Sequence, residues 1–204
     1  SLAKAVKSVT RFLDAGDPAG AFKALDAHAD LLNGRADMGY TPLMAAAFGC
    51  DVDTVRELLR RGADVAPVDM YRFSALTFAT LTKKEDVAGL LLDHKADPNV
   101  LATEGSHTPL NFACTHGQVD LVRKLLDAGA QVRIHRQTDT ELHRAVQGGS
   151  VEVVSLLLDH RADPLAVSRW KGTALDAARD LAHKGSVWGA WVLVVGCWRE
   201  RKCV

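Results

Sequence analysis

The sequence predicts an all-α solenoid in which stacked antiparallel helix pairs are joined by short β-hairpin-like loops. The first observation is a short phrase that opens on Thr41, Ser74, Thr108, Thr140 and Thr173, so that it recurs at intervals of 32 to 34 residues. The second is that each phrase leads into small residues and then into apolar residues at helical spacing. The third is a turn of the Gly-Ala-Asp kind that closes each unit. Self-similarity at this period is typical of stacked repeats that share one elongated core.

The first helix of each unit is predicted from its opening residues. Thr, or Ser once, is a good N-cap, and Pro42 and Pro109 stand at the first helical position of two units. Small residues follow in every unit, as in the Ala45-Ala46-Ala47 run. Small side chains let a neighbouring helix come close, so we expect these helices to pack side by side.

The second helix of each unit is predicted from apolar residues at helical spacing. The pattern Val52, Val55, Leu58 and Leu59 returns near residues 87, 119 and 151. The turns that follow contain Gly62 and Gly129, as a helix C-cap favours. In two units this glycine is replaced by Lys95 and Arg161, and we expect those turns to be more strained or differently built.

Residues 1 to 36 are predicted to form a divergent helix pair that caps the N-terminal end of the core. The break between the two helices is predicted at Gly16-Asp17-Pro18. Apolar residues at helical spacing mark both helices: Leu2, Ala5, Val6, Val9, Phe12 and Leu13 in the first, and Phe22, Leu25, Leu31 and Leu32 in the second.

The order T-P-L-H, A-A, G, V-V-x-L-L-L, G-A-D resembles the ankyrin repeat, over residues 37 to about 182. The resemblance implies antiparallel helix pairs and protein partners bound across the loop tips and inner helices. The His of the family's phrase is present only as His143, which the resemblance implies should bond within its own unit. Other units replace it with Met44, Thr77, Asn111 and Asp176. The linkers before Thr108 and Thr140 differ in length from their neighbours, so the hairpins there should differ in shape.

Composition excludes several classes of function. The formal net charge is zero and no basic stripe runs along the repeats, which argues against general nucleic-acid binding. The four cysteines lie far apart without a C-x-x-C pair, which favours an intracellular reducing compartment. No apolar run is long enough to cross a bilayer. Because the chain begins with Ser1, a removed targeting segment or further domain would leave no trace in it.

No catalytic or cofactor-binding motif is present, so we expect no enzyme activity and no cofactor. His107, Cys114 and His116 share one unit and are residue types that bind metal ions. His107 belongs to the hairpin and Cys114 to the small packing face of a helix, so we expect no metal there.

Candidate partner-binding residues are those that the repeat pattern does not dictate. Trp170 is the strongest case, because an exposed Trp beside basic residues is typical of interface anchors; the alternative is that it folds back onto the chain. For Met70 and Phe48 the alternative is local packing. The loop-tip candidates are Asp69, Met70, Tyr71, Arg72, Glu104, Arg136, Trp170 and Lys171, and the inner-helix candidates are Phe48, Leu81, His116 and Gln147.

The segment 186–204 departs from the repeat and is apolar up to a basic end. If helical, it places Trp188, Trp191, Val195 and Trp198 on one stripe. Three interpretations stay open: docking on a partner protein, folding back over the array as a cap, and lying in a membrane interface with Trp at the level of the headgroups.

The sequence therefore predicts three parts, with a capping helix pair at 1–36, repeats at 37–185 and the apolar element at 186–204. The predicted function is a non-catalytic protein–protein interaction module that acts as a scaffold, adaptor or accessory subunit of a larger assembly. The alternatives are a peripheral membrane anchor that uses the C-terminal tail, and the targeting or regulatory part of a longer enzyme.

Overall fold

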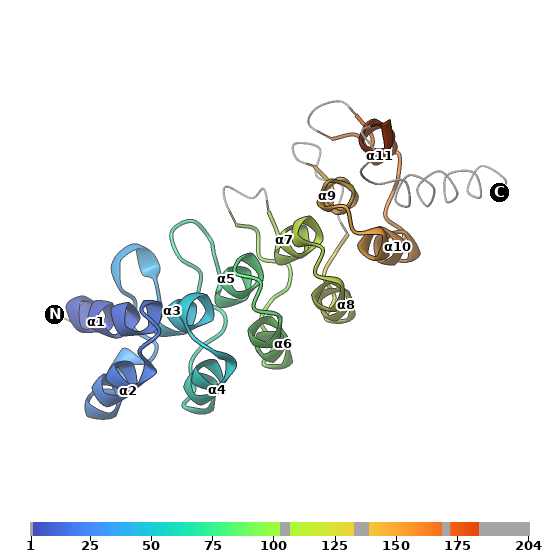
Figure 1. Cartoon of the computed structure of the whole chain (residues 1–204). Helices are drawn as coiled ribbons and strands as arrows, with labels where there is room; N and C mark the ends of the chain where they lie inside the picture. The colour runs from blue at the N-terminus through green and yellow to red at the C-terminus, as the bar shows by residue number, and fades with distance from the viewer. Residues whose placement is uncertain (1, 103–106, 133–138, 169–171, 184–204) are drawn as a thin grey trace. The chain divides into compact units, whose positions relative to one another are not determined.

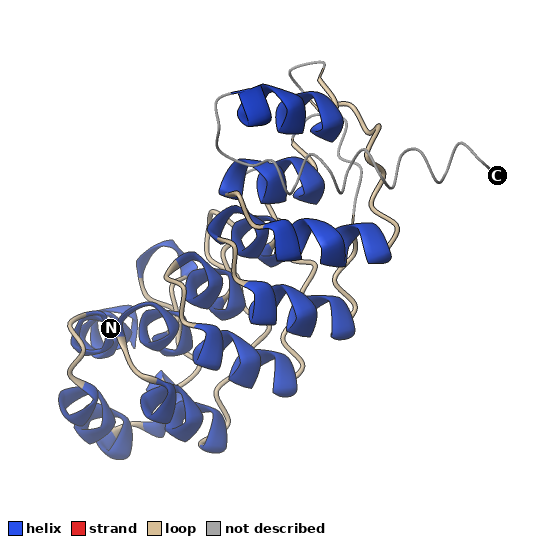
Figure 2. Cartoon of the chain, turned by 45° about the vertical axis from the view of Figure 1, so that its right-hand side comes forward, coloured by secondary structure: helices blue, strands red, loops and turns tan. Residues whose placement is uncertain are grey.

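The computed structural model describes residues 2–102, 107–132, 139–168 and 172–183. The chain divides into unit 1, residues Ser1–Gly105, and unit 2, residues Ser106–Val204, and each is described by itself. Within the described residues, regular structure is helical apart from isolated bridge residues, which include the antiparallel pairs Val68–Ser74 and Val167–Thr173 (Figure 2). The predicted all-α architecture is confirmed.

Unit 1 contains an inner row of helices, α1, α3 and α5, each packed on the next (Figure 1). Each is followed by an outer helix, and α4 packs on α6. The helices are α1 (Leu2–Asp14), α2 (Pro18–Ala27), α3 (Pro42–Gly49), α4 (Val52–Arg60), α5 (Ala75–Leu81) and α6 (Glu85–Asp93), with 3-10 turns at Ala29–Leu31 and Asp37–Gly39.

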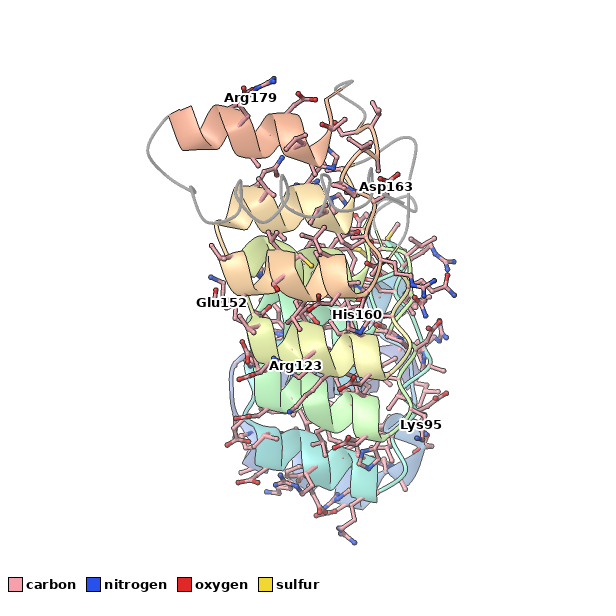
Figure 3. All side chains as sticks on the ribbon, turned by 90° about the vertical axis from the view of Figure 1, so that its right-hand side faces the viewer. Lys95, Arg123, Glu152, His160, Asp163 and Arg179 are labelled. Atoms are coloured by element: carbon pink, nitrogen blue, oxygen red, sulfur yellow. The ribbon has the colours of Figure 1, made fainter. Side chains whose placement is uncertain are left out.

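Unit 2 repeats this plan, with α7, α9 and α11 in the inner row and α10 packed on α8. Figure 3 shows Arg123 and Glu152 on the outward faces of α8 and α10, where both are exposed. The helices are α7 (Pro109–His116), α8 (Val119–Asp127), α9 (Glu141–Gly148), α10 (Val151–Asp159) and α11 (Ala174–His183).

The core contains the residues that the periodicity predicts. Ala45, Ala46 and Ala47 of α3 are fully buried, and so are Val55 and Leu58 of α4. At the N-terminus the prediction was too broad. Val6, Val9 and Leu13 are fully buried, whereas Leu2 and Phe12 remain 52% and 40% exposed. The buried stripe of α1 faces α2, α3 and the 3-10 turn at Ala29–Leu31, and residues at its edges are left in solvent.

The second N-terminal helix is shorter than predicted. It starts at Pro18 behind Asp17, whose side chain accepts a hydrogen bond from the Gly20 amide, and it ends at Ala27. Leu31 is buried from the following 3-10 turn instead. A pattern of apolar residues could not separate these two elements, because both bury Leu at similar spacing.

The inner helices keep the same N-terminal cap although the residue three positions after the cap changes. The cap hydroxyl accepts a hydrogen bond from that residue's amide at Thr41, Ser74, Thr108, Thr140 and Thr173. In three repeats the third residue's side chain also accepts a hydrogen bond from the amide of the cap residue, which completes a capping box: Thr77 at Ser74, Asn111 at Thr108 and Asp176 at Thr173. His143 bonds instead to the hydroxyl of Thr140. The bond from the amide to the cap hydroxyl is therefore kept wherever the family's His is replaced, and Met44 lacks only the returning side-chain bond.

The bond predicted for His143 within its own unit is present, with Nδ1 2.8 Å from Thr140 Oγ1. Its Nε2 also lies 3.2 Å from the carbonyl oxygen of Gly172, in the next repeat. His143 thus ties two successive repeats of unit 2 together.

The turns at Lys95 and Arg161 are strained rather than differently built. Lys95 and Arg161 have φ of +65° and +64°, in the same left-handed region as Gly62 and Gly129 at +92° and +89°. The pair of backbone hydrogen bonds that closes the turn is the same at all four, as in Lys95 N to Leu92 O and Ala96 N to Leu91 O. A side chain in this region costs about 1–2 kcal/mol relative to glycine.

Glycine is required where the end of one inner helix lies against the backbone of the preceding inner helix. A Cβ on Gly49 would lie 2.4 Å from the carbonyl oxygen of Leu13, and one on Gly148 would lie 2.6 Å from that of Thr115. Both glycines stand eight residues after their N-cap. Backbone against backbone therefore sets the spacing of α1 and α3 in unit 1 and of α7 and α9 in unit 2.

Candidate partner-binding face

The loop tips and inner helices of unit 1 border an open hollow of about 480 Å³. It lies where the end of α1, the turn at Asp37–Gly39, the tip around Asp69 and helices α3 and α5 meet. The lining residues are Asp14, Asp37, Met38, Tyr40, Phe48, Asp69 and Phe78. Three of the seven are carboxylates and three are aromatic.

Phe78 is the centre of the aromatic part of this hollow. The rings of Tyr40 and Phe48 stand at 80° and 84° to it, with centroids 5.5 Å and 6.2 Å away. Phe73 lies beside it at 5.3 Å. Edge-to-face contacts of this kind stabilise the cluster beyond its burial. Phe48 nevertheless remains 44% exposed, so the cluster presents ring surface to solvent.

The carboxylates lie around these rings. Asp14 accepts a hydrogen bond of 2.9 Å from the Tyr40 hydroxyl, and Asp69 accepts bonds from the amides of Tyr71 and Phe73 at 2.9 and 2.7 Å. Asp37 pairs with Lys7 at 2.5 Å. Among the described residues, neither Asp14 nor Asp69 forms an ion pair with Lys or Arg.

The pKa values of Asp14 and Tyr40 reflect this setting. Burial raises the pKa of the Asp14 carboxyl, and the hydrogen bond from Tyr40 opposes that rise. Burial, and then the neighbouring Asp14 charge, raise the pKa of Tyr40, so the phenol stays protonated and donates.

The predicted tip residues of unit 1 lie at or beside the hollow. Met70 and Tyr71 are 62% and 55% exposed. Arg72 donates to the carbonyl of Leu101 at 3.1 Å. The Met70 amide donates to the carbonyl of Met38 at 2.8 Å, which ties two tips together. Leu81, 37% exposed, ends α5.

Unit 2 has a different set of residues on the corresponding face. His107 stacks on Phe112 at 5.5 Å, and Arg144 Nη2 lies 3.2 Å from His107 Nε2 and 3.8 Å from Asp139. Burial, and then Arg144, lower the pKa of His107. The predicted Gln147 is exposed on α9 and His116 is half-buried at the end of α7.

Several predicted residues lie outside the part of the chain that the structure describes. These are Glu104, Arg136, Trp170 and Lys171 at the loop tips, and Trp188, Trp191, Val195 and Trp198 in the C-terminal element. Their roles stay predictions.

Sequence reasoning missed five residues that form the hollow or support it. They are Asp14, Asp37, Met38, Tyr40 and Phe78. One signal was available: Tyr40 and Phe73 each precede an N-cap and Phe78 is the fourth residue after one, at positions where another repeat has Gly172 or Ala177. Large aromatic side chains at positions that the fold can fill with Gly or Ala are candidates for function.

No group of three or more His, Cys, Asp or Glu side chains among the described residues is placed to hold a metal ion. Within the same residues, no helix is long and apolar enough to cross a bilayer. Cys50 and Cys114 are buried free thiols, and burial raises the pKa of Cys50 to about 11.

Comparison with known proteins agrees with this architecture. The family model for ankyrin repeats (3 copies) matches residues 14–102 and 99–168. The chain belongs to the ankyrin repeat family. Human ankyrin repeat and SOCS box protein 11 is 43% identical over 89 residues, which are 44% of this chain and 27% of that protein. The transient receptor potential channel pyrexia of Drosophila melanogaster is 28% identical over 149 residues, 73% of this chain and 16% of that protein.

This ankyrin repeat chain thus spans about a quarter or less of the length of those relatives. Among solved structures, it resembles a chain in the complex of the Bd0816 predatory endopeptidase from Bdellovibrio bacteriovorus with immunity protein Bd3460. The TM-score is 0.78 at 23% identity, over 90% of this chain and 96% of that chain. A likeness at this identity shows the fold alone.

Proposed function

We propose that this ankyrin repeat chain is a non-catalytic scaffold, adaptor or accessory subunit that holds a protein partner on the loop tips and inner helices of unit 1. Ankyrin repeats indicate a protein–protein interaction module. The observation that carries the finer proposal is the exposed apolar surface at these tips, formed by Met38, Phe48, Met70 and Tyr71 at 44% to 62% exposure. Met and aromatic residues are enriched at protein interfaces, and contiguous exposed apolar surface marks contact sites.

The tips are also held in place before a partner arrives. The backbone bond between Met70 and Met38 joins two tips, and the Asp69 carboxylate holds the amides of Tyr71 and Phe73. A surface that is already ordered loses little conformational entropy on binding. The same rigidity supports a role as a scaffold rather than as a moving part.

A pull-down with the whole chain tests the proposal. The double variant Met70→Ser/Tyr71→Ser removes apolar surface at the tip, and the matched variant Arg123→Ser/Glu152→Ser changes two exposed side chains on α8 and α10. We expect the chain and the matched variant to retain the same stoichiometric partner in mass spectrometry and the tip variant to lose it. Equal recovery with all three chains would place the partner elsewhere and sink the proposal.

A second possibility is that the repeats are the targeting or regulatory part of a longer protein, such as an enzyme. The observation that favours it is that the relatives contain the matched repeats within much longer chains. A longer reading frame with a catalytic domain would support it.

For the tail, flotation with liposomes of the full chain and of a version ending at Gly185 separates membrane contact from protein docking.

We further propose a reducing intracellular compartment. Cys50 and Cys114 are free and buried, with Cys50 Sγ donating to the Leu13 carbonyl at 3.1 Å. Site-resolved alkylation of the protein taken from its native source, with and without prior reduction, checks whether any cysteine is oxidised there.

A further inference from the structure

The hollow of unit 1 combines unpaired carboxylates with aromatic rings. Among the described residues, its lining includes Asp14, Asp37 and Asp69 and no Lys or Arg. The nearby cations bind other groups: Lys7 binds Asp37, Arg35 donates to the Val68 carbonyl, and the Lys84 ammonium donates to the carbonyls of Phe48 and Cys50. Asp14 and Asp69 therefore face the hollow without a cationic partner among the described residues.

The same unit shows what such a combination binds when a cation is available. Between α2 and α4, the Arg61 guanidinium lies 4.7 Å from the centroid of the Phe22 ring. It also pairs with Asp26 at 2.7 Å and with Glu57 at 2.7 Å. A ring and two carboxylates there hold one guanidinium of the chain itself. The hollow offers rings and carboxylates again, and leaves the guanidinium to come from outside.

The three carboxylates do not form a metal site. Among the described residues, no three acidic, His or Cys side chains are gathered closely enough to hold an ion. They are spread around rings instead, which suits a flat organic cation that uses its faces for stacking and its edges for hydrogen bonds. Arginine has this shape, stacks on aromatic faces and donates to carboxylates in pairs, whereas the compact ammonium of lysine does so less well. The hollow, at about 480 Å³, is in the range of ordinary ligand sites.

We propose that this hollow is the specificity pocket for an arginine side chain of the protein partner. The guanidinium lies against Phe48 and Phe78, and Asp14 and Asp69 supply the opposite charge. Tyr40 keeps Asp14 in position through its hydroxyl, at 2.9 Å. Met38, which lines the pocket, and the exposed Met70 and Tyr71, which follow Asp69 in the chain, contact the neighbouring residues of the partner. This inference rests on the proposed function, since it names the chemistry of the partner at that surface.

The first test is an NMR titration of the full chain with short blocked peptides. The probes are Gly-Ser-Arg-Ser-Gly and the same peptide with Lys, citrulline or Glu in place of Arg. We expect the Arg peptide to shift the amides around Tyr40, Asp69 and Phe78 with at least tenfold tighter binding than the citrulline peptide, which has the same shape without the charge. Equal binding of Arg and citrulline, or of Arg and Lys, would overturn the assignment.

The variants are chosen so that the fold survives. In Asp14→Asn and Asp69→Asn, the remaining amide oxygen still accepts the bonds from Tyr40 and from the tip amides. We expect the double variant to lose at least tenfold in affinity for the Arg peptide. The matched control Asp53→Asn/Asp86→Asn removes two exposed carboxylates from α4 and α6 and should change nothing. A loss shared by both pairs would show general charge attraction and contradict a pocket.

A selection of random twelve-residue peptides covers the case in which a lone Arg binds too weakly to detect. Peptides enriched on the chain should contain Arg at one fixed position and should not survive on the Asp14→Asn/Asp69→Asn variant. Enriched peptides without Arg, or with undiminished binding to that variant, would overturn the pocket. If the Met70→Ser/Tyr71→Ser variant loses the native partner and the aspartate variant keeps it, protein binding stands and the arginine pocket falls.

Discussion

At matching repeat positions, the inner rows of the two units contain different side chains. The residue before the N-cap is Tyr40 or Phe73 in unit 1, and His107, Asp139 or Gly172 in unit 2. The fourth residue after the cap includes Phe78 in unit 1, and Phe112 and Arg144 in unit 2. The backbone plan is the same in both, so the repeat fixes where these side chains lie but leaves their chemistry open.

The difference decides how successive repeats are held together. In unit 1 the rings of Tyr40 and Phe48 pack on Phe78 of the next repeat, and we call this contact between successive repeats an apolar joint. In unit 2 the corresponding contacts are polar joints, from Arg144 to His107 and from His143 to the Gly172 carbonyl. An apolar joint leaves ring surface exposed for a partner, whereas a polar joint uses its groups internally. This is why the candidate pocket is in unit 1.

Phe78→Ala should give the largest loss of stability. Because Phe78 contacts three rings and is half-buried, we expect a loss of about 2–4 kcal/mol, somewhat below the range for fully buried Phe. The matched variant Phe112→Ala removes a ring that stacks on His107, and it should lose about half as much stability. Urea unfolding together with amide exchange of α5 and α7 measures both. Equal losses would remove the distinction between an aromatic and a polar joint.

His143→Ala should be the most damaging change to the polar joint of unit 2. It removes the bonds to Thr140 and Gly172 from a side chain that is only 2% exposed, so we expect a loss of about 2 kcal/mol. Asn111→Ala, which removes only the capping bond, should lose about 1 kcal/mol. Amide exchange of α9 and α11 locates the effect. An equally small loss in both variants would mean that the bond to Gly172 contributes nothing.

Acidification should destabilise unit 2 by part of the amount expected for His143→Ala, and it should destabilise unit 1 less. Burial lowers the pKa of His143 and His107 from the ordinary value near 6.5, so the folded state binds their protons less readily than the unfolded state. Stability from these groups is complete above pH 6.5 and falls as pH drops toward their lowered pKa. Asp14 acts in the opposite sense, because its raised pKa makes proton uptake favour the folded state. Exchange measured from pH 7 to 5 should therefore speed up in unit 2 relative to unit 1, and His143→Asn should reduce that change.

Tyr40→Phe should show that the aromatic joint depends on rings more than on the hydroxyl. The variant keeps the contact with Phe78 and removes one hydrogen bond to Asp14, so we expect a loss of about 1 kcal/mol. In an Asp14→Asn background, Tyr40→Phe should lose less stability, because the group that accepts the Tyr40 hydrogen bond is then an uncharged amide. A loss as large as that of Phe78→Ala would mean that the polar bond, and not the packing, holds this joint.

Lys95→Gly and Arg161→Gly should produce the smallest changes, and the same change in both units. Each residue has positive φ, so glycine should stabilise by about 0.5–1 kcal/mol after its greater freedom in the unfolded chain is subtracted. Gly62→Ala, at the matching turn, is the control and should destabilise by a similar amount. Thermal unfolding checks all three. A stabilisation confined to one unit would show that the turns differ as the inner rows do.

Most of the fold could be predicted from the sequence, because it depends on signals that lie within a single repeat. The cap at Thr108, the apolar spacing of α8 and the turn at Gly129 are local, and each predicts its element without knowledge of the rest. Phe12 was misplaced for the opposite reason: its burial depends on which faces of α1 the neighbouring helices cover.

The candidate site was predicted only in part for the same physical reason. Asp69, Met70, Tyr71 and Phe48 stand out as departures from the repeat. Asp14, Tyr40 and Phe78 come from three different repeats, and only stacking brings them to one hollow. No pattern within one repeat contains the hydrogen bond between Asp14 and Tyr40, so a carboxylate at the end of α1 has no sequence signal of its own.

The absence of a side chain at Gly49 and Gly148 has a consequence for engineering. Two other repeats have Thr82 and His116 at this position, eight residues after the N-cap. The repeats of this chain therefore cannot be exchanged freely for one another. Copying the repeat that contains Thr82 over the one that contains Gly49 would put a branched residue against the Leu13 carbonyl and push two helices apart. Shuffled or averaged versions of this protein will therefore have to keep those two sites empty, whatever else they exchange.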